Sequence, residues 1–327
     1  MIKSKKIAEF ASARTALKYG LMLIGVKPGS VILIPDYLCN VVWYPLLQLG
    51  LKVNTYPVLD NMSPNWFLLE EIQRREPAWA LLMTHYFGQP QNIKQFQDFC
   101  SRHNLLLVED NAHGYGGSLA GKPLGSFGHI GISSPRKILG TPSGGTLYGV
   151  SILPSGLNQN MKSFPAYLPV PLIRTALHSM PKVRRIVKRW AYKGNNWDNP
   201  RLYRESVQPD YGIDWFSHWR IASTDWKAIA VRRRGAWLAW AQFVQRKGLR
   251  SVFSEVHPES CPWAMPAFTS DLGERNSWLE WGAMKGLSLF PWPTLPDDVI
   301  LLEGAALARW RTLVCFPLDS TPSELGL

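Results

Sequence analysis

Short apolar runs alternate with amphipathic segments between residues 31 and 110, and this alternation constrains the fold more than any other feature of the sequence. The apolar runs are VILIP from Val31, KVNTYPV from Lys52, AWALLMTH from Ala78 and LLLVED from Leu105. The segments between them predict helices over Leu38–Leu49, Phe67–Arg75 and Ile93–Arg102. Strands that alternate with helices and are apolar almost throughout are typical of a mostly parallel sheet covered on both faces. The sequence therefore predicts an α/β fold.

The flanking segments extend this prediction in both directions. The first residues are expected to pack as an arm, and Ser12 is a candidate N-cap for a helix that runs to Val26. Further along, HIGIS and TLYGV predict two short strands on either side of Lys137. The alternation stops near Val150, where Ser, Pro, Gly and Asn accumulate.

The remaining sequence predicts a smaller C-terminal α+β module. Its expected elements are helices at Trp226–Gln245, Ser277–Lys285 and Asp297–Arg309, and strands at VFSEV, LSLFPWP and TLVCFPLD. A chain of 327 residues is long enough for two domains of ~150 residues each. We therefore expect a large α/β domain over 1–155, an irregular basic connection over 156–225 and a small domain over 226–327.

Composition and charge exclude several classes of protein. Hydrophobic residues make up 46% of the chain, so it can bury a large core. The four cysteines are widely spaced without a CxxC pair, which argues against a zinc site and a disulfide framework. No apolar run reaches the ~18 residues of a membrane span and no signal peptide is evident, so we expect a cytoplasmic protein. The formal net charge of +12 favours anionic partners, but does not choose among nucleic acid, anionic lipid and a phosphorylated metabolite.

A basic segment within the connection, Lys182–Lys193, has two interpretations. It could form a basic amphipathic helix that lies on a membrane surface. Alternatively, it is a solvated surface helix that turns Val183, Ile186 and Val187 toward the protein. We favour the second interpretation, because most surface helices are built in this way.

The residues with the clearest chemical potential are Asp110 and Lys137. Asp110 ends an apolar strand, and the carboxyl ends of parallel strands face the crevice where α/β proteins bind ligands. Lys137 follows two serines and precedes a Gly-Gly pair. A pyridoxal phosphate (PLP) enzyme needs a lysine for its Schiff base and a carboxylate against the pyridine nitrogen. The pattern alone is equally compatible with a loop-capping Asp110 and a surface Lys137.

The whole chain resembles the DegT/DnrJ/StrS type of nucleotide-sugar aminotransferases, which have the PLP-dependent transferase fold type I. The motifs that carry the resemblance are SARTAL, PGSVILIPDY, THYFGQP, VEDNAH, AGKPLGSFGHIG, SSPRK, SGG, SHWRIAS and VCFPLD. Each is weak alone, but together they are specific. The resemblance implies that PLP is the cofactor. It also implies a homodimer, because the family loop that SHWRIAS resembles reaches the neighbouring subunit.

The resemblance also implies roles for individual residues. Lys137 matches the catalytic lysine that binds the cofactor and moves a proton. Asp110 matches the partner of the pyridine nitrogen, and His113 matches the neighbour of the phenolic oxygen. Ser133, Ala13, Arg14 and Thr15 match the residues that hold the cofactor phosphate. From their position before Lys137, Ser133 and Ser134 could hold either the phosphate or the Lys137 loop.

Several positions depart from the family pattern. Cys39 stands where the family has an aromatic residue that stacks on the cofactor ring, so stacking is expected from its sulfur, from Tyr37 or from elsewhere in the chain. His218 replaces the loop asparagine that contacts the phosphate across the subunit interface. Ala13 replaces a glycine at the helix start, and the spacing between serine and Lys137 is one residue shorter. These departures bear on the substrate more than on the cofactor.

Together these features predict a PLP-dependent aminotransferase that moves an amino group, with glutamate as the expected donor, onto a nucleotide-linked keto sugar for polysaccharide or amino-sugar biosynthesis. The expected partners are these small molecules and a second copy of the chain, with no metal and no nucleic acid. A family branch that dehydrates sugars replaces the lysine with histidine, and Lys137 argues against that branch. The alternative is a non-catalytic descendant that acts as a binding or scaffolding protein in a polysaccharide pathway, attached to a membrane through Lys182–Lys193.

Overall fold

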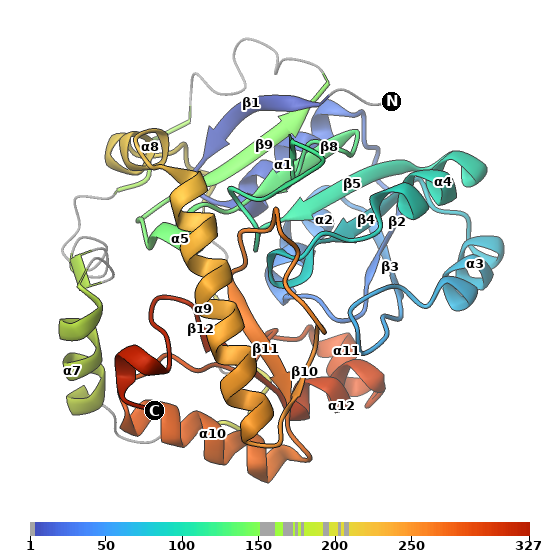
Figure 1. The fold of residues 1–327 in the computed structure, drawn as a ribbon. Helices are drawn as coiled ribbons and strands as arrows, with labels where there is room; N and C mark the ends of the chain where they lie inside the picture. Colours follow the sequence, from blue (N-terminus) through green and yellow to red (C-terminus); the bar gives the residue numbers. More distant parts are fainter. Residues whose placement is uncertain are drawn as a thin grey trace.

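A seven-stranded sheet forms the largest part of the computed structural model (Figure 1), which describes residues 4–150, 161–165, 173, 176–177, 180–191, 196–201, 204–205 and 209–327. The strand order is β1-β9-β8-β5-β4-β2-β3. The strands are β1 (Lys5–Phe10), β2 (Val31–Pro35), β3 (Lys52–Tyr56), β4 (Ala80–Thr84), β5 (Leu106–Asn111), β8 (Ile130–Ser133) and β9 (Gly145–Gly149). Strands β3, β2, β4, β5 and β8 are parallel, β9 pairs antiparallel with β8, and β1 pairs antiparallel with β9. The predicted α/β fold is confirmed.

Helices cover both faces of this sheet, as predicted. They are α1 (Ala13–Leu23), α2 (Trp43–Gln48), α3 (Trp66–Arg75) and α4 (Ile93–His103). The chain reverses its direction along the sheet after β3, so right-handed crossovers place α2 on one face and α3 and α4 on the other. Helix α2 is shorter than the predicted Leu38–Leu49, because Cys39 is extended (φ −66°, ψ 136°) and a 3-10 turn at Asn40–Val42 precedes the helix.

The first described residues, which were expected to pack as an arm, form a strand at the edge of the sheet. Strand β1 pairs antiparallel with β9, from Lys5 opposite Gly149 to Phe10 opposite Gly145. Ala8 and Phe10 are buried on the inner side of this strand, which is the period of two that a half-exposed strand requires. The basic start of the chain hid this pattern in the sequence.

The C-terminal part contains a small antiparallel sheet in the order β10-β11-β12. Its elements are β10 (Arg250–Ser251), β11 (Ala264–Phe268) and β12 (Leu313–Pro317), with helices α9 (Trp226–Arg246), α10 (Leu272–Met284), α11 (Asp297–Leu301) and α12 (Ala305–Thr312). This confirms the small C-terminal sheet, but several predicted elements were wrong. VFSEV is not a strand, and LSLFPWP forms only an isolated bridge from Phe290 to Cys315. The predicted helix Asp297–Arg309 is broken in two, because Glu303 is left-handed at φ 46°.

The remaining elements connect these parts. They are β6 (Ser118–Leu119), β7 (Lys122–Pro123), α5 (Arg136–Leu139), α7 (Pro181–Ala191), α8 (Trp215–Ala222), and 3-10 turns at Tyr86–Gly88 and Ser323–Leu325. The hydrophobic core that includes the large sheet also contains Val252, Phe268 and Trp292 from the C-terminal part. The domain boundaries expected at 155 and 225 therefore stay predictions. No helix in the described ranges is both long and apolar enough to cross a bilayer.

Candidate active site

Parallel strands β4, β5 and β8 bring the candidate residues to one edge of the large sheet. Asp110 lies at the end of β5, in register with Thr84 of β4 and Ile132 of β8. Lys137 follows β8 in the short helix α5, which ends at Gly140 with φ 68°. Asp110 and Lys137 interact electrostatically, since each moves the pKa of the other toward its charged form. The structure thus brings together the two residues on which the cofactor prediction depends.

The Asp110 carboxylate is buried with few partners. Its residue is 4% exposed, and within the described ranges its one side-chain hydrogen bond comes from the amide of Ala112 at 2.8 Å. Burial raises the pKa of Asp110 above its usual value, although that hydrogen bond and Lys137 oppose the shift. The hydroxyl of Thr84 at the adjacent strand end is buried without a hydrogen-bond partner in the described part of the chain. This edge therefore holds polar groups whose bonding capacity is not used.

The Lys137 amine lies in a partly desolvated position. Burial lowers the pKa of Lys137 below its usual value, while Cys39 and Asp110 act in the opposite direction. Its Nζ atom is 4.9 Å from the ring centroid of Trp263, a cation–π contact. Within the described ranges, no carboxylate lies within ion-pair distance of Nζ. A lowered pKa enlarges the fraction of neutral amine, which is the nucleophilic and basic form.

His113 is a neutral, oriented imidazole. Its Nδ1 accepts a hydrogen bond from the amide of Phe87 at 3.2 Å, so the ring proton resides on Nε2. Burial, aided by the Lys137 charge, lowers the pKa of His113 well below its usual value. The ring stacks on Trp263 with centroids 4.4 Å apart and an interplanar angle of 29°. His113 can therefore donate one hydrogen bond from Nε2 in a fixed direction.

Cys39 lies near Lys137, but the aromatic residue beside the amine is Trp263. Burial raises the pKa of the Cys39 thiol and Lys137 lowers it, which places the two groups within electrostatic reach. Tyr37, the other residue considered for stacking, is fully buried and its hydroxyl donates to the carbonyl of Trp292. Sequence analysis missed Trp263, since it is far from Lys137 in the sequence and sits in the proline-rich run CPWAMP. No local pattern could have placed it there.

The two serines before Lys137 are engaged within the protein. The hydroxyl of Ser133 accepts a hydrogen bond from the Asn111 side chain at 3.2 Å. The hydroxyl of Ser134 donates to the carbonyl of Gly144 at 3.5 Å. Both serines are buried, so their expected role at the cofactor phosphate stays a prediction.

The start of α1 packs directly against the Gly-Gly pair that follows Lys137. Ser12 caps the helix by accepting from the amide of Thr15 at 3.3 Å, and the two hydroxyls are 3.0 Å apart. A Cβ atom at Gly145 would lie 2.1 Å from the carbonyl carbon of Ser12 and 2.5 Å from the nitrogen of Ala13, so only glycine permits this approach. The predicted helix start is therefore at the same end of the sheet as α5.

Glu205 links the helix start to α5. Its carboxylate lies 3.0 Å from Nη2 of Arg14 and 3.7 Å from Nη2 of Arg136, and it also acts on the pKa of Lys137. Nη1 of Arg14 is buried and has no hydrogen-bond partner in the described ranges. A carboxylate between two guanidinium groups marks this place as favourable for an anion. Glu205 was also missed, because it belongs to the connection that has no family counterpart.

His218 lies apart from these residues. It is on α8, where the sequence analysis expected a loop, and its Nδ1 is 2.5 Å from the carboxylate of Glu9 on β1. The His218 side chain is 57% exposed. Its expected contact with a neighbouring subunit stays a prediction.

The arrangement fits PLP on three observations. Asp110 is a buried carboxylate without an ion-pair partner in the described ranges, and a protonated pyridine nitrogen would neutralise it. Lys137 provides an amine whose pKa is lowered by burial, within electrostatic reach of that carboxylate. Arg14 keeps one buried guanidinium nitrogen without a partner in the described ranges, beside the start of α1, where a phosphate is favoured.

Comparisons with known proteins show similarity to sugar aminotransferases over the first part of the chain. Residues 1–149 match the model of the DegT/DnrJ/EryC1/StrS aminotransferase family. L-glutamine:scyllo-inosose aminotransferase from Streptomyces griseus is 27% identical over 143 residues, which are 42% of this chain and 33% of that protein. GDP-perosamine synthase from Caulobacter vibrioides is 30% identical over 143 residues, or 41% of this chain and 36% of that protein. The chain thus spans about a third of the length of the curated relatives it matches.

Structural similarity extends over nearly the whole chain. A putative sugar aminotransferase from Streptococcus pneumoniae, described in a PMP form and a PLP form, has a TM-score of 0.70 in the PMP form at 15% identity, covering 98% of this chain and 84% of that one. An aminotransferase of pseudoaminic acid biosynthesis from Helicobacter pylori has a TM-score of 0.70 at 14% identity, covering 97% and 83%. The E. coli GDP-4-keto-6-deoxy-D-mannose-3-dehydratase has a TM-score of 0.66 at 16% identity, covering 99% and 85%. At these identities the similarity shows the shared fold alone.

The sequence match ends at residue 149, so the resemblance of SHWRIAS and VCFPLD to family segments stays a prediction. The matched region contains Arg14, Asp110, His113 and Lys137. Residues 1–149 are therefore similar to the DegT/DnrJ/EryC1/StrS aminotransferase family.

Proposed function

We propose that this protein is a PLP-dependent aminotransferase that moves an amino group, with glutamate as the donor, onto a nucleotide-linked keto sugar. The observation that carries the proposal is the partly buried Lys137 amine beside the buried Asp110 carboxylate at the carboxyl end of the parallel sheet. Bound PLP supplies an electron-withdrawing ring that carries the amino group and makes the proton on the adjacent carbon of the substrate acidic. Residues of this chain would transfer the proton, orient the cofactor ring and bind its phosphate.

Lys137 would hold the cofactor and then act as the general base and acid. With an amino donor bound, the amine of Lys137 would be placed to take the proton from the α-carbon of the donor and to hold it for return. Burial suits this task, since a lysine at its ordinary pKa of ~10.4 would be protonated and unable to accept a proton near neutral pH. The short helix α5 and the left-handed Gly140 fix the direction from which the amine approaches.

Asp110 and His113 would orient and polarise the ring. An ionised Asp110 would stabilise a protonated pyridine nitrogen, and such a cation would oppose the effect of burial on the pKa of Asp110. The Nε2–H of His113 is available to donate to the phenolic oxygen, because Nδ1 is held by the Phe87 amide. Trp263 contacts both Lys137 and His113, and its ring would limit the access of water to them.

Arg14 and the start of α1 would bind the phosphate. The guanidinium has a buried nitrogen without a partner in the described ranges, and the helix amide ends favour negative charge. The net charge of +12 suits a second anion, the diphosphate of a nucleotide sugar. The family resemblance supports a homodimer in the cytoplasm in which α8 reaches the neighbouring subunit.

A pair of half-reactions tests this proposal. The purified chain is saturated with PLP, and its visible absorbance is followed first with glutamate, glutamine or aspartate, and then with nucleotide-linked keto sugars. We expect one donor to abolish the absorbance of the Lys137-bound cofactor and one keto sugar to restore it. The Lys137→Ala protein should show neither change, and Lys94→Ala, which removes an exposed lysine of α4, should show both.

A non-catalytic binding protein is the competing function, and the His218–Glu9 pair favours it, because His218 is already occupied within its own chain. A wild-type chain that stays colourless at saturating PLP would support this alternative and exclude the enzyme. A chain that binds PLP but turns over no donor would have the same meaning.

A further inference from the structure

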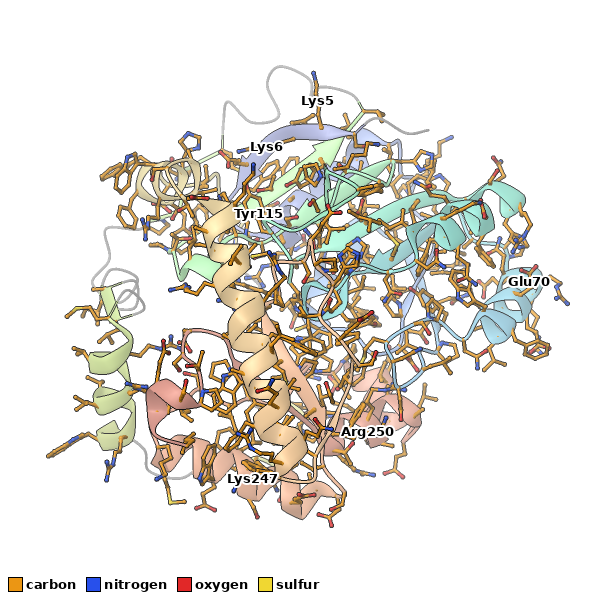
Figure 2. All side chains as sticks on the ribbon, viewed as in Figure 1. Lys5, Lys6, Glu70, Tyr115, Lys247 and Arg250 are labelled. Atoms are coloured by element: carbon orange, nitrogen blue, oxygen red, sulfur yellow. The ribbon has the colours of Figure 1, made fainter. Side chains whose placement is uncertain are left out.

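Helix α7 presents an apolar face to solvent. Val183, Ile186, Val187 and Trp190 recur at the spacing of one helical face, and they are 39%, 60%, 44% and 85% exposed. The expectation that Val183, Ile186 and Val187 turn toward the protein was therefore wrong. By contrast, α4 buries Ile93, Phe96, Phe99 and Cys100. In Figure 1, α7 lies at the left edge of the molecule, next to α10 and the C-terminal segment, and in Figure 2 side chains extend from it away from the other elements.

A polar side of α7 attaches it to the protein. The guanidinium of Arg184 is 2.7 Å from the carboxylate of Asp319 and donates to the hydroxyl of Ser288 at 2.8 Å. The carbonyl of Arg185 packs so closely on Gly286 that a Cβ atom there would lie 2.3 Å from it. These contacts fix the rotation of the helix, so the apolar face is held outward by a specific ion pair and a specific backbone approach.

The charge of α7 indicates what covers this face. Its sequence PKVRRIVKRWA contains five basic residues and no acidic residue. Packing of α7 on α7 of a second copy would bring like charges together, which is unfavourable. An anionic lipid surface accommodates both the apolar face and the basic residues of α7. It accepts apolar side chains below the headgroups and basic groups at the phosphates. With 11 residues the helix is about 16 Å long, so it can lie on a bilayer but cannot cross one.

We propose that α7 docks this protein on the surface of a bilayer that contains anionic phospholipid. The face formed by Val183, Ile186, Val187 and Trp190 enters the boundary between headgroups and acyl chains. Arg185 and Arg189 contact phosphate groups, while Arg184 keeps its ion pair with Asp319. A single short helix gives weak, reversible binding. The inference does not depend on the catalytic proposal, because none of these residues belongs to the Lys137 site.

Flotation with lipid vesicles tests the apolar contribution. The full chain is mixed with vesicles of phosphatidylcholine plus phosphatidylglycerol, and the floated fraction is measured. We expect Trp190→Ser and Ile186→Asn each to weaken binding about tenfold, because each removes a large side chain that the bilayer would bury. Trp215→Ser is the matched control, since this indole of α8 is 80% exposed and should leave flotation unchanged. Equal losses in Trp215→Ser and Trp190→Ser would overturn the assignment to α7.

The charge contribution has its own test. Vesicles of phosphatidylcholine alone should bind much more weakly, and added salt should reduce binding to anionic vesicles. Arg189→Ser should weaken binding to anionic vesicles about fivefold, with no change in the thermal unfolding of the protein. Flotation that is independent of phosphatidylglycerol, or unchanged in Arg189→Ser and Trp190→Ser, would contradict the proposal.

Sedimentation equilibrium tests the alternative that a second copy of the chain covers the apolar face of α7. If the face packs against a second copy, Trp190→Ser will weaken self-association while the wild-type chain fails to float, and the lipid proposal is wrong. If the face meets lipid, the oligomeric state will be the same in both proteins. Since half-reaction kinetics without lipid should be equal in wild type and Trp190→Ser, failure of the docking proposal is distinguishable from failure of the catalytic one.

Discussion

Glu109 and Asp110 are adjacent carboxylates at the end of β5, and their surroundings differ completely. Glu109 is fully buried and accepts hydrogen bonds from three backbone amides, those of Gly125 at 2.6 Å, Phe127 at 2.6 Å and Gly128 at 3.0 Å. Its Oε1 also lies 2.8 Å from Nε2 of His85. Asp110 has the single Ala112 hydrogen bond within the described ranges. Since side chains alternate along a strand, the two carboxylates face opposite sides of the sheet.

The contrast distinguishes a carboxylate whose hydrogen bonds stabilise the fold, Glu109, from one with unused hydrogen-bonding capacity, Asp110. Four partners satisfy Glu109 and tie the loop at 125–128 to the sheet, so it has no bonding capacity left for a ligand. The Ala112 hydrogen bond and the Lys137 charge compensate only part of the desolvation of Asp110, a state that costs free energy and is typical of functional sites. The catalytic proposal depends on this difference.

The largest expected effect comes from Lys137, the basic residue that faces Asp110. Lys137→Ala should lower the rate of transamination by about 10⁴-fold, because the general base is lost together with the anchor of the cofactor. Thermal unfolding should change little, since Lys137 has no ion pair in the described ranges. Steady-state assays and calorimetry measure the two effects. A residual rate within tenfold of wild type would contradict the assigned role.

Neutralising each of the two carboxylates should separate function from stability. Asp110→Asn should lower the rate by at least about 10²-fold through weaker stabilisation of the ring nitrogen, with a change in unfolding free energy of at most about 1 kcal/mol. Glu109→Gln should destabilise the fold by about 3 kcal/mol, because its amide group faces backbone donors that need an acceptor. Urea unfolding of both variants tests the comparison. Equal stability losses in the two variants would remove the distinction.

The pH dependence of stability should reveal Asp110 in the cofactor-free chain. Its pKa in the folded protein is raised above the ordinary value of 3.8. The stability that it contributes is therefore fully present below that value and is lost as pH rises through the raised pKa. Asp110→Asn does not titrate at this position, so it should gain stability relative to wild type as pH rises. Parallel stability curves for the two proteins would show that the carboxylate is not desolvated.

The smallest expected effect concerns Glu205, which lies where an anion is favoured. Glu205→Gln should tighten the binding of PLP by up to about fivefold, because the side chain is half exposed and such ion pairs contribute at most about 1 kcal/mol. An absorbance titration measures this, with Glu280→Gln, an exposed glutamate of α10, as the control. Unchanged or weaker PLP binding in Glu205→Gln would mean that Arg14 does not contact the phosphate.

Much of this architecture was predictable from the sequence, for identifiable reasons. Strands β2 (VILIP), β4 (ALLMT) and β5 (LLVEDN) are buried almost throughout, and such apolar strands indicate a parallel sheet. Strand β11 was not predictable, because Pro266 lies within AMPAF and a proline normally argues against an inner strand. The period of apolar residues in α7 was visible, but period alone does not say what covers a face.

The candidate site also contains residues that the sequence predicted and residues that it did not predict. Asp110, His113 and Lys137 follow strand ends in one continuous stretch, so motif order predicts their meeting. Trp263 and Glu205 reach Lys137 from distant segments through tertiary packing, and no local pattern encodes that approach.

The most direct measurement of the central claim is the position of the bond between PLP and the protein. The chain is incubated with PLP, reduced with borohydride, digested and mapped by mass spectrometry. The account predicts a single modified peptide that contains SSPRK, with the adduct on Lys137. An adduct on another lysine, or no specific adduct at saturating PLP, would contradict it.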